Sequence, residues 1–322
     1  MTESMEPPSD IVDALPEGFA GLIAGAFDLH VHGQPDLSRH LHNRGPDAGV
    51  ARLARRYGLR GWVLKSHLWP TMDRAAALQE QHDPADFVVL GSITLNPPAG
   101  GVAAAPVELA TAHGARVVFL PTWGAAADVE RGGYVARLLA ATSPAFAAYQ
   151  TAAPIRVIDG DGRLTDTMRE VLDACADLGL LLATGHVSLD EALAVAEAAG
   201  ERGQPLLVTH PLHDAIDRPG VLGALAATGA LLEFSGAPLL HPDTRLTVTQ
   251  VATAIAEIGA EHAVLTSDVF SRWVPPEPET LRMFAEQLRY LGATPDELRT
   301  MLVDNPRSLL ARAGVRLDGS PA

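Results

Sequence analysis

The stretch Ala26-Phe27-Asp28-Leu29-His30-Val31-His32 decides the fold class, because it sets polar side chains into a strongly apolar run. Alternate side chains of a β-strand share one face, so a strand here would carry Asp28, His30 and His32 on the same side. Short apolar runs of this kind are typical of strands buried on both faces, as in a parallel sheet. We therefore expect a buried strand that ends in two histidines.

Seven further apolar runs resemble the first. They cover Gly61–His67, Phe87–Leu95, Arg116–Thr122, Leu180–His186, Pro205–His210, Ala230–Ser235 and His262–Asp268. Helical patterns lie between them, and the clearest opens with Ser188-Leu189-Asp190-Glu191, a capping box, with Gly200 as its predicted stop. Strands alternating with helices indicate βαβ units, and eight of them within about 240 residues match a TIM barrel.

The predicted fold is therefore α/β, a (β/α)8 TIM barrel with a long insertion after strand 4. The insertion runs from Trp123 to Arg163, with a predicted helix near Val135–Ala141 and a small hairpin around Asp159-Gly160-Asp161-Gly162. Because it follows strand 4, it should lie over the face that carries active sites, as a lid or a dimer contact.

A doubly wound open sheet is the alternative fold, but no glycine-rich dinucleotide motif follows the first strand. The predicted domain organisation is an N-terminal extension (1–25), one barrel domain (26–315) and a C-terminal tail (316–322).

Composition narrows the class of protein. The net charge of −15 argues against nucleic acid as a partner, because a basic footprint is expected there. No apolar stretch is long enough for a membrane helix, and the N-terminus lacks the basic start and apolar core of a signal peptide. We expect a cytoplasmic enzyme with a small-molecule substrate, and a homo-oligomer is left open. The single cysteine, Cys175, fits a buried structural thiol.

Polar residues gather where the predicted strands end. Strand 2 ends in Lys65-Ser66-His67, and strand 5 in Thr184-Gly185-His186. Strand 6 ends in Thr209-His210, and strand 8 in Thr266-Ser267-Asp268. In a barrel these ends converge on one pocket. Several imidazoles and a carboxylate make a divalent metal site that leaves room for water.

The His30-x-His32 pair, His186, His210 and Asp268 together resemble the amidohydrolase superfamily of metal-dependent hydrolases, in a branch without an assigned substrate. The resemblance spans about Phe27 to Leu310 and includes the late Asn305-Pro306. It implies that His30, His32 and His186 bind metal. It also implies that Asp268 is a ligand and proton shuttle, and that His210 binds a second metal or polarises the substrate.

One feature departs from that superfamily. Many binuclear members carry a carboxylated lysine or a glutamate at the end of strand 4, where this chain reads Leu120-Pro121-Thr122-Trp123. Lys65 is the only lysine beside 23 arginines. It could replace the bridge as a carboxylated ligand, remain cationic and bind substrate or an oxyanion, or merely pair with Asp28.

Other residues are candidates for substrate contact. His67 lies on the same strand face as Lys65 and would bind substrate or metal. Arg39, in the basic loop up to Arg44, would receive an anionic group unless the loop is simply solvated. Trp123 and Trp273, like Trp69, follow strand ends and would wall the pocket. Glu233 fits a polar group inside the barrel rather than a catalytic one.

Three functions remain open. The first is a hydrolase that uses metal-activated water on an amide, cyclic amide, lactone or related ester of a small molecule, with an anionic substrate as one option. The second is a metal-dependent decarboxylase or other lyase on the same scaffold. The third is a barrel that binds a ligand without catalysis. One or two divalent ions are expected, with Zn²⁺ as first choice and Mn²⁺, Fe²⁺ or Ni²⁺ as alternatives.

Overall fold

The computed structural model describes residues 21–37, 45–142, 154–215, 218–242, 244–271 and 273–317. Its centre is a single eight-stranded sheet in which neighbouring strands pair in parallel and in sequence order. The strands are β1 (Phe27–His32), β2 (Gly61–Lys65), β3 (Val88–Thr94), β4 (Ala115–Phe119), β5 (Leu181–Ala183), β6 (Leu206–Thr209), β7 (Leu231–Ser235) and β8 (Ala263–Thr266). Just after β8, the Asp268 amide donates to the His30 carbonyl of β1 at 3.0 Å, which brings the two edge strands together.

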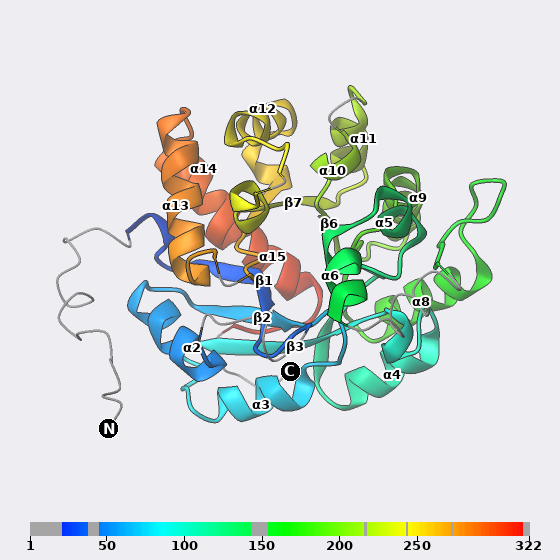
Figure 1. Ribbon diagram of the computed structural model, residues 1–322, viewed down its shortest axis with the longest axis horizontal. Helices are drawn as coiled ribbons and strands as arrows, with labels where there is room; N and C mark the ends of the chain where they lie inside the picture. The colour runs from blue at the N-terminus through cyan, green and yellow to red at the C-terminus, as the bar shows by residue number, and fades with distance from the viewer. Residues whose placement is uncertain are drawn as a thin grey trace.

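Helices surround this sheet (Figure 1). The α-helices are α2 (Asp47–Arg56), α3 (Met72–Gln79), α4 (Ala104–Ala112), α5 (Ala126–Arg131), α6 (Tyr134–Thr142), α8 (Asp166–Asp177), α9 (Leu189–Glu201), α10 (Leu212–Ala215), α11 (Val221–Ala227), α12 (Val248–Ile258), α13 (Glu277–Tyr290), α14 (Pro295–Arg299) and α15 (Asn305–Arg312). Short turns are the 3₁₀ helices η1 (Gly21–Ile23), η2 (Pro97–Ala99), η3 (Ala237–Leu240) and η4 (Ala260–His262), and the π-helical η5 (Thr300–Asp304). The predicted TIM barrel is confirmed.

The apolar core has two layers, as a barrel requires. Inside the barrel, side chains from all eight strands pack together and against α15, with Phe27, Val117 and Phe119 among them. Between the strands and the outer helices lies a larger layer that includes Trp62 and Phe284. Strands buried on both faces explain why the sequence shows continuous apolar runs instead of alternation.

The predicted shared face of Asp28, His30 and His32 does not hold along the whole of β1. The pairing register with β2 shifts between Asp28 and Val31, and Phe27 and Leu29 pack inside the barrel. Asp28 instead accepts from the amides of His30 and Ser267, and it lies near the Glu277 carboxylate on α13. The irregularity turns both histidines toward the site and leaves Asp28 out of it.

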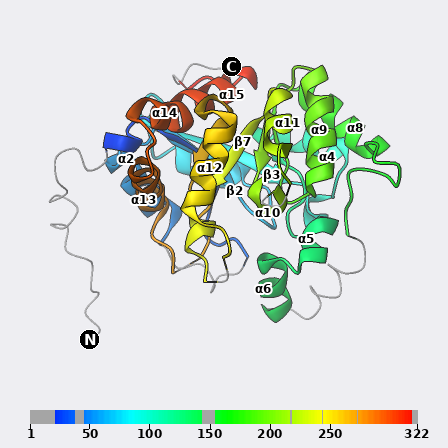
Figure 2. The same ribbon diagram turned by 90° about the horizontal axis from the view of Figure 1, so that it is seen from above.

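The insertion after β4 forms the predicted helix and hairpin. α6 covers the predicted helical region, and Ile158 bridges Leu164 in antiparallel fashion. A second helix, α5, was not predicted. In Figure 2, α5 and α6 lie at one end of the molecule and α15 at the opposite end, so the insertion stands over one mouth of the barrel.

Several local predictions are confirmed and one is off by two residues. The capping box of Ser188 and Glu191 opens α9, but the helix continues through Gly200 to Glu201. Cys175 is buried, as expected. Arg39, most of the predicted N-terminal extension and most of the C-terminal tail lie outside the described residues. Within the described ranges, no helix is long and apolar enough to cross a membrane.

Candidate metal centre

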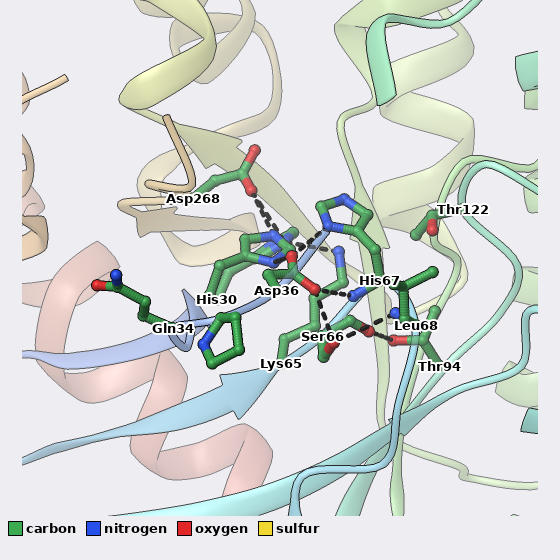
Figure 3. Close-up of polar contacts among 12 residues, drawn as sticks. His30, Gln34, Asp36, Lys65, Ser66, His67, Leu68, Thr94, Thr122 and Asp268 are labelled. Carbon is green, nitrogen blue, oxygen red and sulfur yellow. Dashed lines mark hydrogen bonds and ion pairs between the residues drawn. The ribbon is translucent and has the colours of Figure 1, made fainter. Parts of the chain in front are cut away.

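Two histidines and an aspartate converge at the ends of β1 and β8. One ligand atom each from His30, His32 and Asp268 lies within 4.8 Å of the others, and all three side chains are buried. The Nε2 atoms of His30 and His32 are each 3.1 Å from Asp268 Oδ1. From β2, Lys65 Nζ approaches His30 Nε2 to 2.8 Å (Figure 3). Of the residues predicted as ligands, these four lie together, whereas His186 lies outside the group.

Four imidazoles of the region have a carboxylate on Nδ1. Four such contacts occur: His30 Nδ1 to Glu233 Oε1 at 2.6 Å, His32 Nδ1 to Asp36 Oδ2 at 2.7 Å, His67 Nδ1 to Asp36 Oδ2 at 2.5 Å, and His186 Nδ1 to Asp128 Oδ1 at 3.0 Å. A carboxylate behind a histidine is the usual arrangement around metal ligands, because it fixes the tautomer and orients the ring. The pattern marks these Nε2 atoms as donors of electron pairs.

The donor set fits a cation. A carboxylate only accepts hydrogen bonds, so Nδ1 of His30 and of His32 carries the proton of each neutral ring. In neutral rings both Nε2 atoms therefore carry lone pairs that a cation beside Asp268 Oδ1 could accept. Without a cation, a protonated His32 donates to that oxygen, and Lys65 Nζ donates to His30 Nε2. Two imidazoles and one carboxylate are ordinary ligands for Zn²⁺ and related ions, and these residues could hold one.

Electrostatics keep the key carboxylate ionised. Burial opposes ionisation of Asp268, but His30, His210 and the hydrogen bond from His32 outweigh it and hold the pKa of Asp268 well below its usual range. Burial lowers the pKa of Lys65, and the carboxylates of Asp268 and Glu233 oppose that effect. Among the described residues, no ion pair joins Lys65 to Asp28, so the predicted structural pairing does not occur.

His186 lies beyond β5 and outside this first group. Gly185 places it: the residue has φ of 60°, and a Cβ there would lie 2.3 Å from the Leu120 carbonyl oxygen. Asp128, the first buried acid of α5, then holds His186 Nδ1. The rings of His186 and His210 have centroids 5.4 Å apart, and those of His210 and His213 4.7 Å. A second set of imidazoles thus borders the first.

Two site residues adopt left-handed backbone conformations. His210 has φ of 49° and Asp268 has φ of 51°, and these are the positive-φ residues other than glycine in the described chain. Such conformations cost energy for residues with a Cβ and concentrate at functional sites. They aim both side chains at each other, with His210 Nε2 3.3 Å from Asp268 Oδ2.

A cavity of about 700 Å³ opens above these residues. Its lining includes His67, His186, His210 and Asp268 from the strand ends. The insertion supplies another wall, and the loops after β7 and β8 face it. Three arginines line the cavity: Arg131, Arg137 and Arg245. Its two acidic lining residues, Asp128 and Asp268, are both engaged by imidazoles.

The two predicted tryptophans do not line this cavity. Trp123 is completely buried, and its Nε1 donates to the His67 carbonyl at 2.7 Å. Trp273 is 49% exposed and makes edge contacts with Tyr134 and His241 at the rim. Both therefore support pocket residues from behind or beside them.

The sequence pattern did not predict the contacts of four residues of the site. Asp36 and Asp128 lie in segments that follow strands, without a local motif. His213 follows His210 by three residues, a spacing that could have drawn attention to it. Glu233 was placed inside the barrel, which is correct, but its contact with His30 was not foreseen.

Residues 25–233 match the model of a family described as a family of unknown function (DUF6282), and this span covers more than half of the chain. The chain belongs to this family. No curated protein sequence matches this DUF6282 member.

Solved structures with the same barrel have low sequence identity. An amidohydrolase from Pseudomonas aeruginosa superposes with a TM-score of 0.61 at 13% identity, covering 92% of this chain and 98% of that one. The probable dipeptidase PvdM from Pseudomonas aeruginosa gives 0.59 at 13%, covering 95% and 99%. A 2,6-dihydroxybenzoate decarboxylase from Rhizobium gives 0.56 at 11%, covering 89% and 99%. The resemblance to the amidohydrolase superfamily thus holds for the fold of this DUF6282 chain.

Proposed function

We propose that this DUF6282 protein is a metal-dependent hydrolase that cleaves an amide, cyclic amide, lactone or related ester of a small anionic molecule. The observation that carries the proposal is the convergence of His30, His32 and Asp268, each imidazole backed by a carboxylate, beside a cavity that Asp268 lines. Hydrolases among the structural neighbours support the class of reaction.

His30, His32 and Asp268 would hold the ion, and we propose Zn²⁺ or Mn²⁺, with His186 as a further ligand if its loop closes toward the centre. When bound, the metal would supply Lewis acidity, which polarises a carbonyl and promotes ionisation of water. Asp268 Oδ2 is the site that accepts the proton of the attacking water. His210 Nε2 lies 3.3 Å from that oxygen, and its role in the proposal is to turn to the developing oxyanion.

The anionic character of the substrate rests on the cavity walls. Arg131, Arg137 and Arg245 line the cavity in a protein whose net charge is −15. A carboxylate or phosphate on the substrate would therefore meet guanidinium groups opposite the metal centre. Lys65 would act at the reacting end, as a carboxylated ligand or as a cation beside the oxyanion, and its Nζ lies 2.8 Å from His30 Nε2 in support of this role.

A decarboxylase is the second candidate. The end of β4 carries Leu120-Pro121-Thr122-Trp123 in place of a bridging ligand, which suits a single ion, and one structural neighbour is a decarboxylase. Product analysis separates the two reactions: hydrolysis gives an acid and an amine or alcohol, whereas decarboxylation releases CO₂.

The test begins with elemental analysis of protein purified without chelator and then supplied with Zn²⁺ or Mn²⁺. Metal-loaded protein is next incubated with N-acyl amino acids, cyclic amides, lactones and aryl carboxylic acids, with products identified by mass spectrometry. We expect bound metal and hydrolysis that Asp268→Asn abolishes and His113→Ala, on an exposed helix end, preserves. A protein that takes up no metal would overturn the proposal, and CO₂ release alone would favour the second candidate.

A further inference from the structure

His67 is held by hydrogen bonds through its backbone and its ring. Its amide donates to Asp36 Oδ1 at 2.7 Å, and its Nδ1 contacts Asp36 Oδ2. Its carbonyl accepts from Asn96 Nδ2 at 2.8 Å and from Trp123 Nε1 at 2.7 Å. The side chain is 2% exposed. Four hydrogen bonds thus fix the position of one imidazole.

The other ring nitrogen of His67 has no such partner. Among the residues that the structure describes, nothing hydrogen-bonds to His67 Nε2, although the residue lines the cavity. Asp36 also accepts from Ser66 Oγ at 2.6 Å, so the serine hydroxyl and the His67 amide both donate to Oδ1. A carboxylate that accepts these hydrogen bonds leaves Nδ1 of neutral His67 as the donor to Oδ2, and Nε2 then carries a lone pair.

His67 belongs to a different group of potential ligand atoms from the one proposed as the metal centre. The potential ligand atoms form two groups in the described part of the chain, His30–His32–Asp268 and His32–Asp36–His67. His32 belongs to both, through Nε2 in the first and Nδ1 in the second. The His32 and His67 rings stack with centroids 4.2 Å apart and planes inclined by 10°. Figure 3 shows the contacts of Asp36 with Ser66 and His67.

Resting on the proposed function, we infer that His67 is not a metal ligand but the hydrogen-bond acceptor that receives an N–H or O–H of the substrate beside the metal. Asp36 is the positioning residue: one carboxylate fixes the tautomer of the metal ligand His32 and of the substrate-facing His67. The substrate class is therefore narrowed to molecules with a donor hydrogen next to the attacked bond, such as a secondary amide or cyclic imide. A simple ester or lactone lacks that hydrogen.

The tautomer is tested by ¹⁵N–¹H spectra of histidine-labelled protein, without and with Zn²⁺, with the His67 signals assigned from their loss in His67→Ala. We expect His67 protonated at Nδ1, and an Nε2 resonance that Zn²⁺ does not convert to a metal-bound one. Asp36→Asn should shift His67 away from this tautomer. A zinc-bound Nε2, or an Nε2–H in the wild type, would overturn the inference. The wild-type spectra decide this even if Asp36→Asn does not fold.

The donor class is tested by calorimetry on zinc-loaded protein with two probes, acetohydroxamate, which carries N–H and O–H, and acetate, which carries neither at neutral pH. One hydrogen bond contributes about 1 kcal/mol to binding. His67→Ala should therefore lower the affinity for acetohydroxamate about fivefold and leave the affinity for acetate unchanged. His113→Ala should change neither. An equal loss of affinity for both probes would overturn the assignment of His67 as the hydrogen-bond acceptor. Failure of the proposed function would appear separately, as absence of zinc uptake.

Discussion

The Nδ1 atom of His30 lies 2.6 Å from Oε1 of Glu233, which joins β1 to β7 across the interior of the barrel. The same oxygen accepts from Thr266 Oγ1 of β8 at 2.7 Å. The proposed metal ligand His30 is thus oriented by a side chain that is buried too deeply to reach a substrate. The affinity of the centre should depend on Glu233 even though Glu233 would touch no ion.

Glu233→Gln tests this dependence. The amide keeps the shape of the side chain but loses the charge that strengthens His30 as a ligand. Changes of this kind typically cost about 10–100-fold in metal affinity. Competition with a chromophoric chelator measures the loss, and Glu286→Gln on the outer helix α13 serves as the control. Equal affinities in both variants would show that Glu233 only fills the barrel.

Lys65→Arg should lose most activity although it retains the charge. The Lys65 side chain is completely buried against the Phe119 ring, with Nζ 4.9 Å from the ring centroid. A guanidinium is larger, planar and permanently cationic, and it would not form a carbamate. If Lys65 is carboxylated, Lys65→Ala should also lose a metal ion, and bicarbonate or a small acid should partly restore it. An active Lys65→Arg enzyme with normal metal content would contradict a role in the site.

Gly185→Ala should destabilise the fold and displace His186. The matched control is Gly203→Ala, since Gly203 has φ of 65° but nothing within 4 Å of a Cβ, whereas a Cβ at Gly185 would meet backbone oxygen at 2.3 Å. The left-handed backbone alone costs about 1–2 kcal/mol with a Cβ present. Urea unfolding should give roughly that cost at position 203 and a larger one at 185. Similar costs at the two positions would remove the steric argument.

Because of Tyr57, the free energy of unfolding should vary with pH in the alkaline range. Its hydroxyl donates to Glu279 Oε2 at 3.0 Å, and burial, followed by the Glu279 charge, raises the pKa of Tyr57 to about 12. The unfolded chain releases this proton near pH 10, so it binds fewer protons than the native state between about pH 10 and 12. The stabilisation is complete below pH 10 and is lost as the pH rises toward 12.

Tyr57→Phe should therefore melt below the wild type near pH 9, by an amount typical of one hydrogen bond, and the difference should shrink toward pH 12. Tyr290→Phe, at a side chain that is 90% exposed, is the control. The single lysine and four tyrosines of the chain leave few other groups to titrate in this range. A difference in melting temperature that stays constant with pH would refute the linkage.

The barrel and the strand-end residues could be predicted because they depend on local pattern. Apolar runs define buried strands, and the C-terminal ends of parallel strands must meet. That logic identified Lys65, His67, His210 and Asp268 without any contact information. It failed for Asp28, because a register shift within β1 reverses the expected alternation.

The partners of the histidines could not be predicted in the same way. Asp36 and His67 are 31 residues apart, and Asp128 and His186 are 58 apart. The chain has 39 acidic residues, and no spacing rule selects the three that contact an imidazole Nδ1. Trp123 shows the same limit, since its position after β4 was clear but the fold turned its indole toward the His67 backbone.

The left-handed conformations of His210 and Asp268 lower the stability of the fold at positions proposed to serve activity. Glycine would occupy these backbone positions with less strain, by roughly 1–2 kcal/mol at each site. A mutant library screened only for survival after heating would therefore enrich glycine at positions 210 and 268, and the survivors would have lost the two side chains proposed to act on the substrate. Thermostable variants of this protein should be sought at other positions, with residues 210 and 268 held fixed in the library.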